Sequence, residues 1–234
     1  MLLLKSIRVH YDKREAVKGI GLKVAEGDFV VIIGPNGAGK TSILNVISGV
    51  VNPSDGEVWF RSERIDGLPP EKVAARGIIH VPEARRIFPR LTVIENLEMG
   101  AYLQKDKTKA KRELERIFHL FPILKERIRQ RGENLSGGEQ QMLAIGRGLM
   151  AGPTLLLIDE PSLGLSPLVT QHLAGQMTQI NREGIAILLV EQNARMGLKL
   201  ANHGYVLTNG ELVLEGTTAE LVENEEIRKA YLGL

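Results

Sequence analysis

Apolar runs of strand length recur along the chain, each bounded by polar or turn-forming residues. They are rich in Val, Ile and Leu, and several are apolar at every position, as in strands that are buried on both faces. We expect strands over residues 3–11, 21–24, 29–33, 57–60, 78–81, 155–158 and 185–190. The last two runs each follow a helical stretch, which is typical of a parallel sheet covered by helices. The pattern therefore predicts an α/β fold.

Between these runs, the apolar residues have the spacing of a helix. Residues 40–48 place Ile43, Leu44 and Ile47 on one side, directly after a Gly-rich loop that follows the strand at 29–33. The sequence thus predicts the succession strand, Gly-rich loop, helix.

Charged residues mark the other helical regions. The segment 92–131 is helix-rich, and charges crowd its stretch 105–116, a pattern typical of a solvated helical face. Thr217 and Glu220 have the spacing of a capping box, which predicts the start of a final charged helix. Residues 52–56, with the sequence Asn-Pro-Ser-Asp-Gly, predict a turn before the strand at 57–60.

Length and composition narrow the class of protein. The 234 residues suit one domain, or one core with an inserted subdomain. A formal net charge of +2 argues against nucleic acid as the main partner, because there is no single-sign field to attract phosphates. The absence of cysteine excludes disulfides and fits a reducing cytoplasm. No apolar run approaches the ~20 residues of a membrane-spanning helix or resembles a secretory signal, so we expect the protein to stay where it is made.

The loop after the strand at 29–33 fits the phosphate-binding pattern G-x-x-x-x-G-K-[ST]. Its residues are Gly34, Pro35, Asn36, Gly37, Ala38, Gly39, Lys40 and Thr41. The preceding strand and the following helix are the context that this motif requires. Backbone N–H groups would surround a β-phosphate, Lys40 would reach the β- and γ-phosphates, and Thr41 would offer its hydroxyl to Mg²⁺. The alternative interpretation is a simple Gly-rich turn.

Two adjacent carboxylates, Asp159 and Glu160, end the strand predicted at 155–158. The carboxyl end of a central parallel strand points into the ligand crevice of such folds. We expect Asp159 to hold Mg²⁺ through its water shell and Glu160 to polarise the attacking water as general base. Two solvated acids at a strand end are the alternative.

A second candidate anion site lies at Ser136, Gly137 and Gly138. Ser136 and Glu139 have capping-box spacing before a helical pattern, which by itself indicates only a helix start. The two glycines after the cap would expose the N–H groups of the first turn to an anion. One nucleotide cannot easily use both this site and the phosphate loop.

Together the phosphate loop, the sequence LSGGEQQ at 135–141 and LLLIDEP at 155–161 resemble the nucleotide-binding subunits of ABC transporters, over nearly the whole chain. The resemblance implies a P-loop NTPase core with a parallel sheet, an N-terminal antiparallel β subdomain and an inserted α-helical subdomain. The core and β subdomain would comprise about 1–84 and 150–234, and the helical subdomain about 85–149. It also implies ATP and Mg²⁺ as cofactors and a head-to-tail pair of subunits, in which the Ser136–Gly138 site of one covers the ATP of the other.

Further positions follow from the resemblance one at a time. Tyr11 matches the aromatic residue that stacks on adenine, although a lone Tyr in a strand can equally be core. Residues 162–166 match the loop that touches the partner subunit, and can otherwise be an ordinary strand-to-helix connection. Two positions depart from the common pattern: Glu83 replaces a Gln, and Gln192 replaces the switch His. Glu83 can still ligate Mg²⁺, whereas Gln192 can donate a hydrogen bond to the γ-phosphate but cannot take up a proton.

These departures, with the sequences at 81–93 and 190–193, resemble one branch of the family, the smaller ATP-binding subunit of bacterial branched-chain amino-acid importers. That resemblance implies a second ATP-binding subunit, with homodimer or heterodimer undecided, two integral membrane permease subunits, a periplasmic amino-acid-binding protein and a place on the cytoplasmic face of the inner membrane. Residues 85–103 would meet the membrane subunits, although a solvated helix edge is an equal alternative for each residue. The runners-up are a urea or lipopolysaccharide-type transporter and a non-transport ABC ATPase.

The mechanism implied for the site is ATP-driven closure of two subunits followed by in-line attack of water on the γ-phosphate. Glu160, Lys40 and Gln192 would be the catalytic side chains, and the transported molecule would not touch this subunit.

Overall fold

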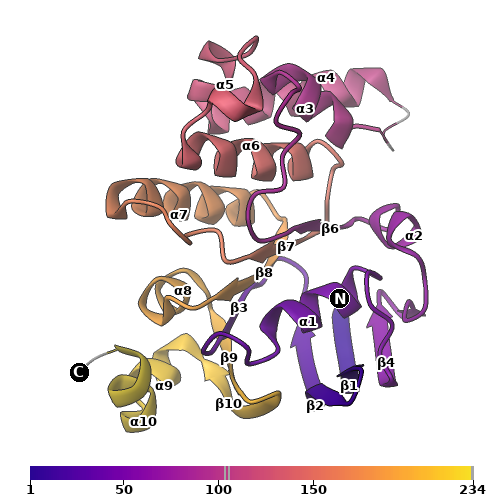
Figure 1. Ribbon diagram of the computed structural model, residues 1–234, viewed down its shortest axis with the longest axis vertical. Helices are drawn as coiled ribbons and strands as arrows, with labels where there is room; N and C mark the ends of the chain where they lie inside the picture. The colour runs from indigo at the N-terminus through magenta and orange to yellow at the C-terminus, as the bar shows by residue number, and fades with distance from the viewer. Residues whose placement is uncertain (103, 105, 233–234) are drawn as a thin grey trace.

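The computed structural model describes residues 1–102, 104 and 106–232. Leu103 and Lys105, at the ends of two segments considered above, lie outside the described residues. Two sheets and a group of helices make up the molecule (Figure 1).

The larger sheet has the strand order β10-β9-β3-β8-β7-β6. Its strands are β3 (Phe29–Ile33), β6 (Ile78–Val81), β7 (Leu155–Asp159), β8 (Ala186–Glu191), β9 (His203–Thr208) and β10 (Glu211–Thr217). Neighbours from β9 to β6 pair in parallel, and β10 runs antiparallel to β9. The parallel α/β sheet expected from the sequence is confirmed.

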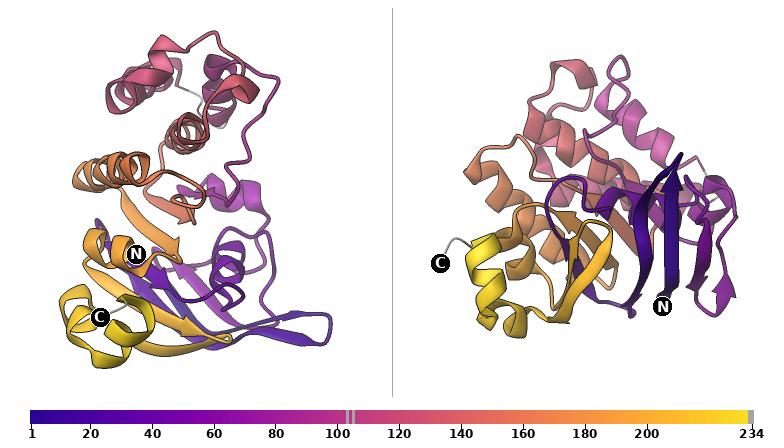
Figure 2. Two further views of the ribbon diagram at one scale, coloured as in Figure 1. Left: turned by 60° about the vertical axis from the view of Figure 1, so that its left-hand side comes forward. Right: turned by 60° about the horizontal axis from the view of Figure 1, so that its bottom comes forward.

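The smaller sheet is antiparallel and has the order β2-β1-β4-β5. Its strands are β1 (Leu2–Tyr11), β2 (Arg14–Val24), β4 (Asp55–Phe60) and β5 (Glu63–Arg64). β1 and β2 form a long hairpin that projects to one side of the molecule (Figure 2, left). The antiparallel β part expected near the N-terminus is therefore present.

The helices cover both faces of the larger sheet. They are α1 (Lys40–Ile47), α2 (Pro70–Ala74), α3 (Val93–Gly100), α4 (Lys107–Leu120), α5 (Pro122–Glu126), the 3₁₀ turn η1 (Gly132–Asn134), α6 (Gly137–Leu149), α7 (Pro167–Arg182), α8 (Ala194–Leu200), α9 (Thr218–Glu223), α10 (Glu225–Ile227) and the π-helical turn η2 (Arg228–Leu232). Helices α3 to α6 gather at the top of Figure 1, away from the smaller sheet. This arrangement matches the expected helical insertion, while its boundaries at 85 and 149 stay a prediction.

Burial on both faces explains why the central strands are apolar throughout. In β3, Val31 and Ile33 pack with the helices from α3 to α8, whereas Val30 and Ile32 pack with α1 and the smaller sheet. β7 and β8 alternate in the same way, so successive side chains enter two different cores. The central strands are thereby fixed in register, and the loops at their carboxyl ends are held in place.

Several elements differ from the expectation. β2 begins at Arg14 instead of residue 21, because a two-residue turn with Asp12 in the left-handed region (φ 52°) pairs Arg14 with Tyr11. Asp55 and Gly56, expected in a turn, start β4; Gly56 has φ 97°, and a Cβ there would lie 2.6 Å from the Lys5 carbonyl oxygen, so it occupies an irregularity in the pairing of β1 with β4.

The C-terminal region contains more structure than expected. Strands β9 and β10 have no counterpart in the expectation; β9 pairs in parallel with β3, and β10 pairs antiparallel with β9. The capping box of Thr217 and Glu220 is confirmed at the start of α9, but α10 and η2 follow it. Among the described residues, no helix has both the length and the apolar character needed to cross a membrane.

Candidate functional site

The phosphate loop joins β3 to α1, and close contacts require glycine at two of its positions, Gly34 and Gly39. Gly39 precedes α1 with φ 101°, and a Cβ there would lie 2.6 Å from the Ala16 carbonyl oxygen. A Cβ on Gly34 would collide with the carbonyl oxygen of Leu207. The backbone therefore approaches its neighbours more closely than any other residue type permits.

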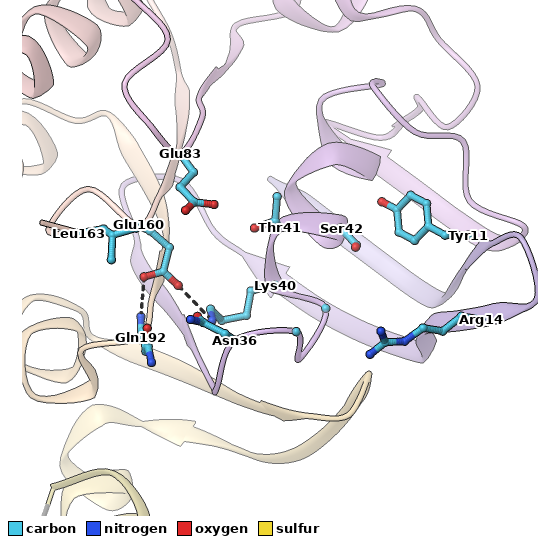
Figure 3. Close-up of a pocket in the computed structure, with 12 residues that line it drawn as sticks. Tyr11, Arg14, Asn36, Lys40, Thr41, Ser42, Glu83, Glu160, Leu163 and Gln192 are labelled. Atoms are coloured by element: carbon cyan, nitrogen blue, oxygen red, sulfur yellow. Dashed lines mark hydrogen bonds and ion pairs between the residues drawn. The ribbon is translucent and has the colours of Figure 1, made fainter.

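Lys40 is buried at the first turn of α1, with 5% of its surface exposed. Its ammonium donates hydrogen bonds to the carbonyl oxygens of Gly34 (2.8 Å) and Pro35 (3.2 Å). Its Nζ also lies 3.0 Å from Oε1 of Glu160, which follows β7 (Figure 3). The phosphate-loop cation and the candidate general base thus form a buried ion pair.

Glu160 is held by bonds to the segment after β8. Its backbone N–H donates to the Val190 carbonyl oxygen (2.9 Å), and its Oε2 accepts a hydrogen bond from the backbone N–H of Gln192 (3.1 Å). Its φ of 46° lies in the left-handed region, which is rare for a residue with a Cβ. Such a conformation persists only where surrounding contacts determine it, and it is often found at functional sites.

These side chains border a cavity of about 430 Å³, a size ordinary for a small-molecule site. Its lining residues are Tyr11, Arg14, Asn36, Gly37, Gly39, Lys40, Thr41, Ser42, Glu83, Glu160, Leu163 and Gln192. Figure 3 shows Glu160 between Lys40 and Gln192, with Tyr11 and Arg14 at the opposite end. A phosphate chain at Lys40 and a planar ring at Tyr11 would fit this layout.

The structure brings together most of the site residues expected from the sequence. Tyr11, Glu83, Glu160 and Gln192 meet the phosphate loop at one cavity although they are far apart in the chain. Ala38 instead packs into the core, and Gly34 and Pro35 contribute carbonyl oxygens to Lys40.

Three residues that line the cavity were not expected. Arg14 arrives there because the hairpin turn places it opposite Tyr11, and Ser42 follows the motif in α1. Leu163 belongs to the loop at 162–166. For Arg14 and Ser42 the only sequence signal was adjacency to residues already singled out, whereas Leu163 was expected at a partner contact and not at the cavity.

Asp159, the last residue of β7, is 1% exposed, and neither of its carboxylate oxygens has a hydrogen-bond partner. The pKa of Asp159 is raised to about 6, chiefly by burial; the negative charges of Glu160 and Glu83 add to the rise, and Thr41 and Lys40 oppose it. An unpartnered buried carboxylate is unfavourable unless a cation or a proton joins it.

Asp159, Thr41 and Glu83 fit a magnesium ion. Within the described part of the chain, no group of three or more His, Cys, Asp or Glu could hold a metal alone. Mg²⁺ is commonly bound by one or two carboxylates and keeps its remaining positions for water and substrate phosphates. The donor set therefore suits Mg²⁺ that arrives with a nucleotide.

The Ser136 to Gly138 segment starts α6 as expected. Ser136 caps the helix: its side chain accepts from the N–H of Glu139, whose carboxylate accepts from the Ser136 N–H (2.7 Å). None of the residues described as lining the cavity comes from this segment. The two candidate anion sites are thus separate, as the sequence suggested.

Comparison with known proteins identifies this arrangement. A family model described as ABC transporter matches residues 17–163. The chain belongs to the ABC transporter family. It is an ABC ATPase, whose ATP hydrolysis energises transport.

Similar proteins match over all or nearly all of their length. The high-affinity branched-chain amino acid transport ATP-binding protein BraG of Pseudomonas aeruginosa is 45% identical over 233 residues, covering 100% of both chains. The lipopolysaccharide export system ATP-binding protein LptB of Escherichia coli is 32% identical over 238 residues, covering 99% of this chain and 97% of its own.

Solved ABC cassettes share the fold. One, an ATP-binding cassette of an ABC transporter in its ADP conformation, has a TM-score of 0.85 at 26% identity and covers 100% of this chain and 99% of its own. A dimeric bacterial ABC transporter cassette has a TM-score of 0.84 at 25% identity, covering 93% and 99%. Cassettes of this family form dimers.

We expect the buried charge of Asp159, which the reaction requires, to lower the stability of the folded chain. The unfolded chain releases this proton near pH 3.8 and the folded chain near pH 6, so stability falls as the pH rises through that window, by at most about 3 kcal/mol. In EDTA, we expect Asp159→Asn to raise the unfolding temperature at pH 8 by roughly 5 °C. The two proteins should converge at pH 4, and the substitution should abolish Mg²⁺-dependent turnover. An equal difference in unfolding temperature at both pH values would contradict this prediction.

Proposed function

We propose that this ABC ATPase energises an importer of branched-chain amino acids, Leu, Ile and Val. The observation that carries the substrate class is the 45% identity to BraG across the whole of both chains. The corresponding identity to LptB is 32%, which favours the amino-acid importer over lipopolysaccharide export.

The cavity residues have complementary roles toward ATP. The ring of Tyr11, 44% exposed at the cavity, is available to stack on adenine. The N–H groups of the phosphate loop would surround the β-phosphate, and Lys40 would move from Glu160 to the β- and γ-phosphates. Thr41 and Asp159, with Glu83 beside them, would hold Mg²⁺, which supplies charge neutralisation on the phosphate oxygens when bound.

Release of Lys40 is the step that would activate Glu160. In the chain alone, the carboxylate is neutralised by the ammonium 3.0 Å away. Transfer of Lys40 to the phosphates would leave Glu160 free to accept a proton from the attacking water. Gln192 would donate its side-chain amide to the γ-phosphate, with no proton transfer at this position.

A second ATP-binding subunit would complete the site. Ser136, Gly137 and Gly138 lie outside the cavity that holds Lys40, so they would serve a nucleotide held by the partner. The similar dimeric cassette supports such a pairing.

Two integral membrane permease subunits would dock near the segment 85–102. This region exposes apolar side chains at Phe88 (43%), Met99 (48%) and Tyr102 (84%). Arg85, Arg86 and Arg90 supply positive charge beside them. An exposed aromatic and basic surface suits a protein interface and would place the chain on the cytoplasmic face of the inner membrane, with a periplasmic binding protein acting indirectly.

The function is tested with the assembled transporter. We expect the chain, purified with the membrane and ATPase subunits encoded beside it, to hydrolyse Mg²⁺-ATP faster with a leucine-loaded binding protein than with the unloaded one. If no branched-chain amino acid changes the rate of ATP turnover, the chain is still an ATPase but the proposed substrate class is wrong. Stimulation by urea or by lipopolysaccharide would instead favour the corresponding transporter class, and the absence of turnover would refute hydrolysis.

A further inference from the structure

Glu191 is a fully buried carboxylate to which the mechanism above assigns no role. It ends β8 with 0% of its surface exposed. Its backbone lies beside Ile33 of β3, the residue directly before the phosphate loop, and the preceding Val190 lies beside Asp159 of β7. The backbone of Glu191 is therefore held between the strands that carry both halves of the site.

The carboxylate of Glu191 joins two loops. Oε1 accepts a hydrogen bond from the backbone N–H of Ser162 (3.2 Å), and Oε2 accepts from the Ser162 hydroxyl (3.0 Å). Oε2 also accepts from the backbone N–H of Asn193 (3.3 Å). One side chain thus binds the first residue of the loop at 162–166 and the residue directly after Gln192.

A second bond between the same two segments closes a ring. Glu160, two residues before Ser162, accepts from the N–H of Gln192, two residues before Ala194 of α8. Residues 160–162 and 191–193 are consequently fixed to each other at two points. A displacement of one segment must displace the other or break a buried hydrogen bond.

The loop at 162–166 exposes an apolar side chain beside the site. Leu163 lines the nucleotide cavity and is 53% exposed, although it is apolar. An exposed apolar side chain beside the site gains stability when a second protein covers it. A displacement of this loop acts directly on Glu191, because the Ser162 hydroxyl is hydrogen-bonded to the Glu191 carboxylate.

Because Glu191 is buried, its three hydrogen-bond donors require a carboxylate at this position. Desolvation raises the pKa of Glu191, the hydroxyl of Ser162 opposes that shift, and the charge of Glu160 adds to it. A carboxylate accepts from all three donors, whereas an amide of the same shape turns N–H groups toward at least one of them. Unsatisfied buried donors are unfavourable, so glutamine would loosen one of the two loops.

We propose that Glu191 is a positioning residue that couples the loop at 162–166 to the segment carrying Gln192. A contact of the partner with that loop would then act on Glu160 and Gln192 through Glu191. The inference rests on the proposed function, since it assigns the regulation of the same hydrolytic site.

Kinetics of the assembled complex provide the first test. Glu191→Gln should lower kcat about tenfold or more and change KM for ATP less than about threefold, because the carboxylate does not touch the nucleotide. Ser162→Ala should lower kcat about threefold, and adding it to Glu191→Gln should change kcat by less than about 1.5-fold, because both substitutions remove one interaction. Thr178→Ala is the matched control: it also removes one half-buried hydroxyl donor, bonded to the Ala174 carbonyl oxygen within α7.

A purely structural carboxylate would give a different pattern. The unfolding temperature would then fall while kcat at a permissive temperature stayed near its original value, and the two substitutions would act independently. If Glu191→Gln fails to fold, the proposal is tested with Ser162→Ala alone. An unchanged kcat in Ser162→Ala would overturn the proposal.

Hydrogen exchange tests the coupling without turnover. In a Glu160→Gln background, Mg²⁺-ATP should protect residues 34–41, 160–166 and 190–196 together. With Glu191→Gln added, protection at 34–41 should persist while that of the other two segments is lost or separated. Equal protection of those segments with and without Glu191 would overturn the coupling, and no protection at 34–41 in either protein would refute nucleotide binding itself.

Discussion

Glu160→Gln is expected to reduce ATP turnover by about 10²–10⁴-fold, the usual contribution of a general base. The amide has the size of the carboxylate but cannot accept the proton of the attacking water. Because one amide oxygen can still accept a bond from Lys40 or from the N–H of Gln192, the cavity should keep its shape. Steady-state hydrolysis and direct ATP binding, measured on the same preparation, separate these two effects.

The expected signature is loss of turnover with retained affinity. ATP should bind within about threefold of the original affinity, and the bound state should accumulate because hydrolysis no longer ends it. Glu223→Gln, on the exposed end of α9, is a control for the same chemical change away from the cavity. Retention of more than a tenth of the turnover in Glu160→Gln would exclude Glu160 as the base.

We expect the second largest effect from Lys40→Ala. This substitution should weaken the binding of ATP instead of slowing the hydrolytic step. A charged hydrogen bond to phosphate contributes about 1.5–3 kcal/mol, so we expect ATP affinity to fall by roughly 10- to 100-fold or more. The same substitution removes the buried cation beside Glu160, whose side chain is 9% exposed. Breaking such a pair typically costs about 3–5 kcal/mol of stability.

The double variant separates the two consequences. Lys40→Ala with Glu160→Gln leaves neither partner of this ion pair charged, so urea unfolding should show most of the lost stability restored. ATP affinity, measured by calorimetry, should remain low because the phosphate-binding ammonium is still missing. Recovery of affinity together with stability would show that Lys40 acts on the fold and not on the nucleotide.

The chemistry-bearing segments were predictable because their signals are local. The phosphate loop depends on glycines at fixed spacing between a strand and a helix, and the capping boxes at Ser136 and Thr217 depend on contacts three residues apart. The strands at 29–33 and 78–81 match the structure at both ends. The first is an uninterrupted apolar run that is buried throughout, and the second ends where Pro82 interrupts the strand. The division of the site between Lys40, Asp159 and Glu160 followed from the same motifs.

Elements stabilised by distant partners were not predictable. β9 and β10 exist because β3 offers a pairing edge, and β2 reaches back to Arg14 because the turn at Asp12 lets it pair with β1. The preference for a strand depends strongly on the neighbours with which it pairs, so tertiary contacts decide where these strands begin and end.

The sequence by itself determined that this protein has an α/β fold, a phosphate loop and two adjacent acids at the end of a strand. Only the tertiary structure decided that Lys40 pairs with Glu160, 120 residues away along the chain, and that Asp159 is left without a partner. It likewise decided that Glu191 binds Ser162. The physical reason is that spacing specifies which groups a loop presents, whereas burial and pairing depend on neighbours that long-range packing brings together.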